Sequence, residues 1–94
     1  VALGVAARPL GLPPVRVAAF YLHAMASNLV SCATRFVPLG QTEGQGALAA
    51  LASVIEAVAR ETLGADPARI ASAAFGADLA ALAHETMDVR IFRT

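Results

Sequence analysis

The stretch VRVAAFYLHAMASNLVSCATRFVPLGQTEGQ, residues 15–45, decides the fold. Its apolar residues recur at steps of three and four, the spacing of one face of an α-helix: Ala18, Leu22, Met25, Leu29, Cys32 and Phe36. Proline is tolerated in the first helical turn, so the helix can start near Pro14. The pattern predicts a helix through residue 36, with Cys32 as a buried thiol on this apolar stripe.

The opposite side of this helix is small and polar rather than highly charged: Arg16, His23, Ser27, Ser31 and Thr34. Such a face suits contact with another protein segment as well as with water. We therefore expect His23 to lie on a packed polar face.

The segment after this helix is predicted to be a corner. Pro38 disfavours the α conformation in the residue before it, so the helix should stop there, and Gly40 can take the conformation needed for a turn. Thr42 and Gln45 then match a capping box that starts a second helix, with Glu43 at the positive end of its dipole. Loss of the Thr42 cap should cost about 1 kcal/mol.

Two residues of this corner are not explained by capping alone. Neither Gln41 nor the side-chain-free Gly44 is needed for a capping box. We therefore hypothesise that the corner packs closely against another segment or subunit. A phosphate loop is a poor alternative for the three nearby glycines, because no Lys-Ser/Thr pair follows and no strand precedes.

The second helix is predicted to run to about Leu63 and to end at Gly64. Its apolar stripe consists of Leu48, Leu51, Ile55, Val58 and Thr62. Glu56 and Arg60 are spaced as an i,i+4 ion pair on the other side.

Two shorter helices and a tail are expected beyond Gly64. Asp66-Pro67 is typical of a cap and first helical residue, here of a short helix through about Ser72. A last helix over 77–86 should direct Leu79 and Leu82 inward. No segment alternates apolar and polar residues as a strand would, so the predicted class is all-α: two long antiparallel-type helices, short C-terminal helices and an extended tail.

Composition excludes several classes of function. The 94 residues suit one domain or part of one, and the helical opening VALGVAAR predicts that the N-terminal part of the domain is missing. Seven Arg balance seven acidic residues, which provides no electrostatic footprint for nucleic acid or anionic lipid. Residues 15–37 contain Arg16, His23, Asn28 and Arg35, so we expect no membrane span. A single cysteine fits a reducing cytoplasm.

No catalytic or metal constellation is evident in the sequence. His84-Glu85 is not a zinc HExxH motif, because position 88 is Asp, and His84 is better placed as a cation at a helix C-terminus. In the tail, the alternatives are a frayed end or a segment that orders on a partner. In the second case Phe92 would be the anchor and Arg90 a buried hydrogen-bonding group.

Two stretches resemble the urease accessory protein UreF family. These are YLHAMASNLVSCATRF followed by VPLGQTEGQ, and HET followed by RIFRT at the end. The resemblance runs from about Ala18 to Thr94 and corresponds to the C-terminal portion of a family member. The chain departs from the family pattern where Met87-Asp88-Val89 replaces the usual Gln-Tyr-Ser.

The resemblance implies a non-catalytic, cytoplasmic adaptor for urease maturation. Such a protein would bridge UreD (also called UreH) and the GTPase UreG, form a homodimer, and serve nickel insertion into apo-urease without binding nickel or another cofactor itself. The partner-binding residues that it implies are Arg90, Ile91, Phe92 and Arg93 in the tail, His84 and Glu85 before it, and Gln41, Thr42 and Gln45 at the corner.

Tyr21 and His23 are candidates for a homodimer or UreG surface. Two other readings remain: an unrelated α-helical structural or oligomerisation module, and an enzyme or metal-binding protein whose key groups lie elsewhere.

Overall fold

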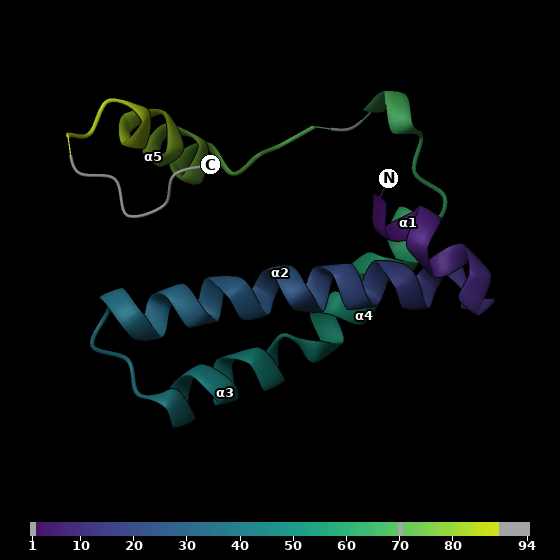
Figure 1. The fold of residues 1–94 in the computed structure, drawn as a ribbon, viewed down its shortest axis with the longest axis horizontal. Helices are drawn as coiled ribbons and strands as arrows, with labels where there is room; N and C mark the ends of the chain where they lie inside the picture. Colours follow the sequence, from purple (N-terminus) through teal and green to yellow (C-terminus); the bar gives the residue numbers. More distant parts are fainter. Residues whose placement is uncertain (1, 70, 89–94) are drawn as a thin grey trace.

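The computed structural model of the chain describes residues 2–69 and 71–88 (Figure 1). This part consists of α-helices and two 3₁₀ helices with no strand, which confirms the all-α class. The α-helices are α1 (Ala2–Ala7), α2 (Pro14–Phe36), α3 (Gln41–Ala50), α4 (Ala52–Thr62) and α5 (Phe75–Glu85); the 3₁₀ helices are η1 (Arg8–Leu10) and η2 (Pro67–Arg69).

Helix α2 has the bounds that the sequence predicts. It begins at Pro14, behind Pro13, and ends where Val37 turns to an extended conformation (φ −115°, ψ 146°) before Pro38. The Val37 N–H still donates to the Ala33 carbonyl at 2.9 Å, which closes the last turn. Upstream, Gly11 ends α1 and η1 with a left-handed φ of 61°, a conformation that glycine adopts without steric cost.

By length and composition alone, α2 could cross a membrane. The core helix of a soluble protein passes the same test. The argument that α2 packs against protein rests on its polar residues Arg16, His23, Asn28 and Arg35.

The face of α2 that packs is not the predicted apolar stripe. Helices α3 and α4 both contact α2; in Figure 1 α3 lies below α2 and α4 passes behind it. Ala26 is buried on this side, and Val30 and Thr34 meet α3. On the stripe, by contrast, Met25 is 48% and Leu29 64% exposed. Small side chains permit close approach between helices, so the packed face is the one with small residues.

The expectation of a buried thiol at Cys32 is therefore wrong. Its thiol is free and only half-buried, because the stripe on which it lies is not the packed face.

The predicted second long helix is two helices, α3 and α4, separated at Leu51. Hydrogen bonds continue across the junction: the Leu51 N–H donates to the Ala47 carbonyl (3.2 Å), and the Ile55 N–H donates to the Leu51 carbonyl (2.9 Å). No proline or glycine marks the break, so the sequence pattern predicts one helix. Figure 1 shows the change of direction that lets both segments contact α2.

The stripe on α3 and α4 is confirmed in part. Ile55 is buried, whereas Leu51 is 38% exposed and Thr62 is exposed. The most deeply buried side chain in the described part is Ala59, at 0% exposure on α4. On the outer face Glu56 and Arg60 form the expected ion pair, 2.9 Å between Oε2 and NH2; because both side chains are well exposed, it contributes only a few tenths of a kcal/mol.

Beyond α4, the helices that the structure describes contact no other helix. The Asp66 carboxylate accepts from the Ala68 N–H at 3.0 Å, as predicted, although η2 ends at Arg69 rather than at Ser72. The Ser72 hydroxyl accepts from the Ala74 N–H (3.3 Å) and donates to the Asp78 carboxylate (3.2 Å), which holds the start of α5.

Helix α5 begins at Phe75, two residues earlier than expected, and contacts no other described helix. Extended residues 71–74 precede it (Figure 1). The expectation that Leu79 and Leu82 point inward is wrong for this structure, in which they are 66% and 62% exposed. Their burial would need a neighbouring element that α5 does not have here.

Candidate functional site

The corner between α2 and α3 is built differently from the predicted capping box. Helix α3 begins at Gln41 with Gly40 as its N-cap, so the expectation of a Thr42 cap is wrong. The Glu43 carboxylate accepts from the Gly40 N–H at 2.8 Å, which is the reciprocal half of a capping box. Gly40 has no side chain to supply the other half. The carboxylate also lies in the first turn, near the positive end of the helix dipole.

Because Glu43 and not Thr42 makes the cap hydrogen bond, the cost of substitution is expected at Glu43. We expect Glu43→Ala to destabilise the protein by about 0.5–1 kcal/mol, because it removes a cap hydrogen bond and a favourable charge. Thr42→Ala should change the free energy of unfolding by less than about 0.5 kcal/mol, as for a surface site. Urea denaturation followed by circular dichroism measures both. A larger effect for Thr42→Ala than for Glu43→Ala would show that Thr42 caps the helix.

Gly44 is the point of closest approach between α3 and α2. A Cβ atom built on Gly44 would lie 2.8 Å from the Thr34 Cγ2 atom and 3.1 Å from the Val30 Cγ1 atom. The Thr34 hydroxyl donates to the Ser31 carbonyl at 3.0 Å, so the hydroxyl is held against its own helix while the methyl group meets α3. The hypothesis that the corner packs closely against another segment is confirmed for Gly44.

The three polar corner residues face solvent. Gln41, Thr42 and Gln45 are all exposed and lie within the first five residues of α3. The structure thus brings these candidates together on one short segment. Burial of Gly44 beneath them fixes this segment against α2.

Tyr21 and His23 do not form one surface. Both are exposed on α2, but residues two apart on a helix point roughly 160° away from each other. Tyr21 lines an open apolar groove between α1 and α2. His23 is exposed rather than packed, so the expected packed polar face is wrong at this position. One interface of modest size would not include both side chains.

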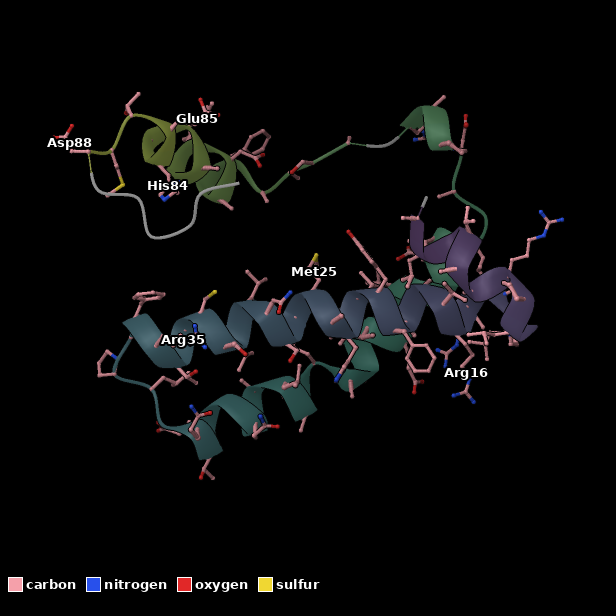
Figure 2. All side chains as sticks on the ribbon, in the orientation of Figure 1. Arg16, Met25, Arg35, His84, Glu85 and Asp88 are labelled. Atoms are coloured by element: carbon pink, nitrogen blue, oxygen red, sulfur yellow. The ribbon has the colours of Figure 1, made fainter. Side chains whose placement is uncertain are left out.

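The end of α5 carries the remaining described candidates. His84 is half-buried in the last turn, where a cation is favoured by the helix dipole, and Glu85 is exposed. The Thr86 hydroxyl and N–H both donate to the Ala83 carbonyl, at 3.1 and 3.3 Å, and so close the helix. Figure 2 shows His84, Glu85 and Asp88 at this end, on a different part of the molecule from the corner.

The predicted tail anchors Arg90, Ile91, Phe92 and Arg93 lie outside the described residues. Within residues 2–69 and 71–88, no three His, Cys, Asp or Glu side chains lie close enough to share a metal ion. The described part is thus an all-α chain whose candidate residues lie at helix ends and on helix faces, all of them exposed except the half-buried His84.

Comparison with known proteins places this all-α chain in a family of urease accessory proteins. The model of the UreF family matches residues 1–52. Over all 94 residues the chain is 63% identical to the urease accessory protein UreF of Cereibacter sphaeroides strain KD131, and it covers 45% of that protein. It is 54% identical to UreF of Jannaschia sp. strain CCS1 and 50% identical to UreF of Paracoccus denitrificans, covering 43% and 44% of them.

The chain belongs to the UreF family. It spans less than half the length of these relatives. No solved structure matches it. Membership in the family sets aside the reading of an unrelated helical module.

Proposed function

We propose that these residues are the C-terminal part of a single helical UreF domain, and that the whole protein is a urease accessory protein. The observation that carries this proposal is identity of 63% to a urease accessory protein across the entire chain. A similarity that extends from α1 through α5 includes both the corner and the C-terminal segment, the two stretches that resemble the family.

In this proposal the protein works as an adaptor and not as an enzyme. It bridges UreD (UreH) and the GTPase UreG, acts in the cytoplasm as a homodimer, and supports nickel insertion into apo-urease through the complex. Nickel is the cargo of the assembly and no cofactor is bound by this chain. The all-helical scaffold, with polar candidate residues at helix ends, is compatible with binding other proteins.

Each group of candidate residues has a distinct role in the proposal. Residues 90–93 anchor the tail on UreD, with the Phe92 ring and the Arg90 guanidinium as the main contacts, because aromatic and Arg side chains dominate interface energies. His84 and Glu85 orient the last turn of α5, from which the tail starts. Gln41, Thr42 and Gln45 form a second contact surface at the corner. Tyr21 and His23 lie on separate faces of α2, so no single contact surface includes both.

The tail role is tested with Arg90→Ala in the full-length protein. We expect weaker co-elution with UreD on a sizing column and lower urease activation, while circular dichroism shows unchanged helix content. Loss of an Arg that is a binding hot spot weakens binding by about 2 kcal/mol or more, which is roughly thirtyfold. Arg69→Ala is the matched control, because Arg69 is exposed in η2 and far along the chain from the tail.

A truncation after Thr86 provides the stringent version of the same experiment. The adaptor proposal expects the truncated protein to stay helical and to lose co-elution. Co-elution that survives both Arg90→Ala and the truncation would remove the tail from the UreD site.

A further inference from the structure

A continuous apolar band runs along one side of α2. At its N-terminal end, α1 and α2 border an open groove of about 870 Å³, lined by Leu3, Leu12, Val17 and Tyr21 among others. From Tyr21 the band continues to Met25 and Leu29 at steps of four residues, which keeps them on one side of the helix. Figure 2 shows the Met25 side chain pointing away from α3. We call these six residues the α2 band.

The α2 band is more exposed to solvent than is usual for apolar residues in a folded domain. Tyr21 is 58%, Met25 48% and Leu29 64% exposed. The buried hydrophobic residues of the described part are only Ala7, Ala26, Ile55 and Ala59, three of which are alanines. Contiguous exposed apolar surface of this kind marks a place where another element packs.

The composition of the α2 band favours permanent burial. None of its six residues is charged, and the only charged side chain on the wall of the groove is that of Arg8. Surfaces that exchange partners are about as polar as the rest of a protein surface, whereas permanently buried ones are more apolar. A band without charges therefore resembles the inside of a domain more than a docking surface.

The position of Ala2 and Leu3 indicates which segment covers the band. The chain spans about 45% of its relatives' length, so more than half of a UreF polypeptide lies outside these residues. Ala2 and Leu3 line the groove, and a segment that precedes Val1 would therefore begin at the edge of the band. A segment on the same polypeptide also loses less entropy on packing than a separate molecule does.

We propose that the α2 band is covered by the part of the UreF polypeptide that precedes residue 1, and is not the contact surface for UreD, UreG or a second copy. This inference rests on the proposal that residues 1–94 are the C-terminal part of the domain. It assigns this apolar surface to the interior of the folded protein. Tyr21 then packs inside the domain and is no longer a candidate for contact with a partner protein.

Thiol labelling of the purified full-length protein, without any urease component, tests this assignment. The native cysteines, Cys32 among them, are replaced by serine, and a single cysteine is introduced by Leu29→Cys on the band. Ser53→Cys, at an exposed position on α4, is the matched control because the change keeps the side-chain size. Met25→Cys provides a second position on the band if Leu29→Cys does not fold.

The expected result is that a maleimide labels the band cysteine at least tenfold more slowly than the Ser53→Cys variant, at every protein concentration. In urea the two rates should become equal. Equal native rates would overturn the inference, as would protection that appears only at high protein concentration, which indicates a second copy. Protection that appears only after addition of UreD, UreG or lipid vesicles would also overturn it. Urease activation is read separately, so failure here is distinguishable from failure of the proposed function.

Discussion

Replacing Gly44 by leucine should separate α3 from α2 and destabilise the protein by about 1–3 kcal/mol, the usual cost of overpacking a well-packed contact. A Cβ alone would sit 2.8 Å from the Thr34 methyl carbon, closer than real Cβ contacts. Thr34 has little freedom to move aside, because its hydroxyl is bonded to the Ser31 carbonyl. The higher helix propensity of leucine offsets about 0.8 kcal/mol of this cost.

Gly46→Leu is the matched control, because it introduces the same side chain two residues later on the same helix. A Cβ on Gly46 meets no atom within 4 Å, so only the gain in helix propensity remains. We expect it to leave the protein unchanged or to stabilise it by up to about 1 kcal/mol. Urea denaturation of the two variants compares them directly. Equal effects at the two positions would show that the α2–α3 contact does not depend on Gly44.

The Gly44 contact also bears on partner binding. If the exposed corner residues contact a partner, then Gly44 acts by holding their segment against α2. Combining Gln41→Ala with Gly44→Leu would then reduce partner binding by more than Gln41→Ala alone. The comparison separates a side chain that touches the partner from one that places the contact surface.

Where the sequence contains strong local signals, it predicts the fold well. Pro14 and Pro38 mark the start and end of α2 at the expected places, because proline restricts the backbone irrespective of its surroundings. The Asp66 cap and the Glu56–Arg60 pair form as expected for the same reason: both depend only on residues within one turn.

The sequence predicts less well which side of a helix is packed. The large apolar stripe of α2 has the stronger periodic signal, yet α3 packs on the neighbouring side with Ala26 and Val30. Small residues produce a weak hydrophobic signal but allow two helices to approach closely. Leu79 and Leu82 show the same difficulty, because their apolar spacing is clear while no other helix in the described part of the chain contacts α5.

The hydrophobic pattern also does not predict helix boundaries at which no proline or glycine interrupts the helix. The junction at Leu51 keeps its hydrogen bonds and has helical dihedral angles (φ −77°, ψ −11°), so no residue type marks it. At the start of α3, two caps compete: a Thr42 hydroxyl and a Glu43 carboxylate. The carboxylate forms the hydrogen bond, and the helix therefore begins one residue before Thr42.

For the candidate residues too, the sequence predicts some features and not others. The resemblance of two sequence stretches predicts the family, and comparison over the whole chain confirms it. The position of the corner relative to α5 could not be predicted, since it depends on tertiary structure. The separation of Tyr21 from His23 follows instead from their spacing on one helix. The importance of Gly44 could be inferred from the sequence because capping leaves that glycine unexplained.

The central claim is that these residues are a working part of a urease accessory protein. The most direct measurement replaces the matching segment of Cereibacter sphaeroides UreF with residues 1–94 and expresses the chimera in cells of that organism that lack UreF. The two segments align over their full length at 63% identity, so the chimera should fold. Urease activity and the nickel content of purified urease are then compared with those in cells that carry the native UreF or none.

We expect the chimera to restore both urease activity and nickel content to within a few-fold of the native protein. A soluble, helical chimera that leaves urease inactive and free of nickel would contradict it.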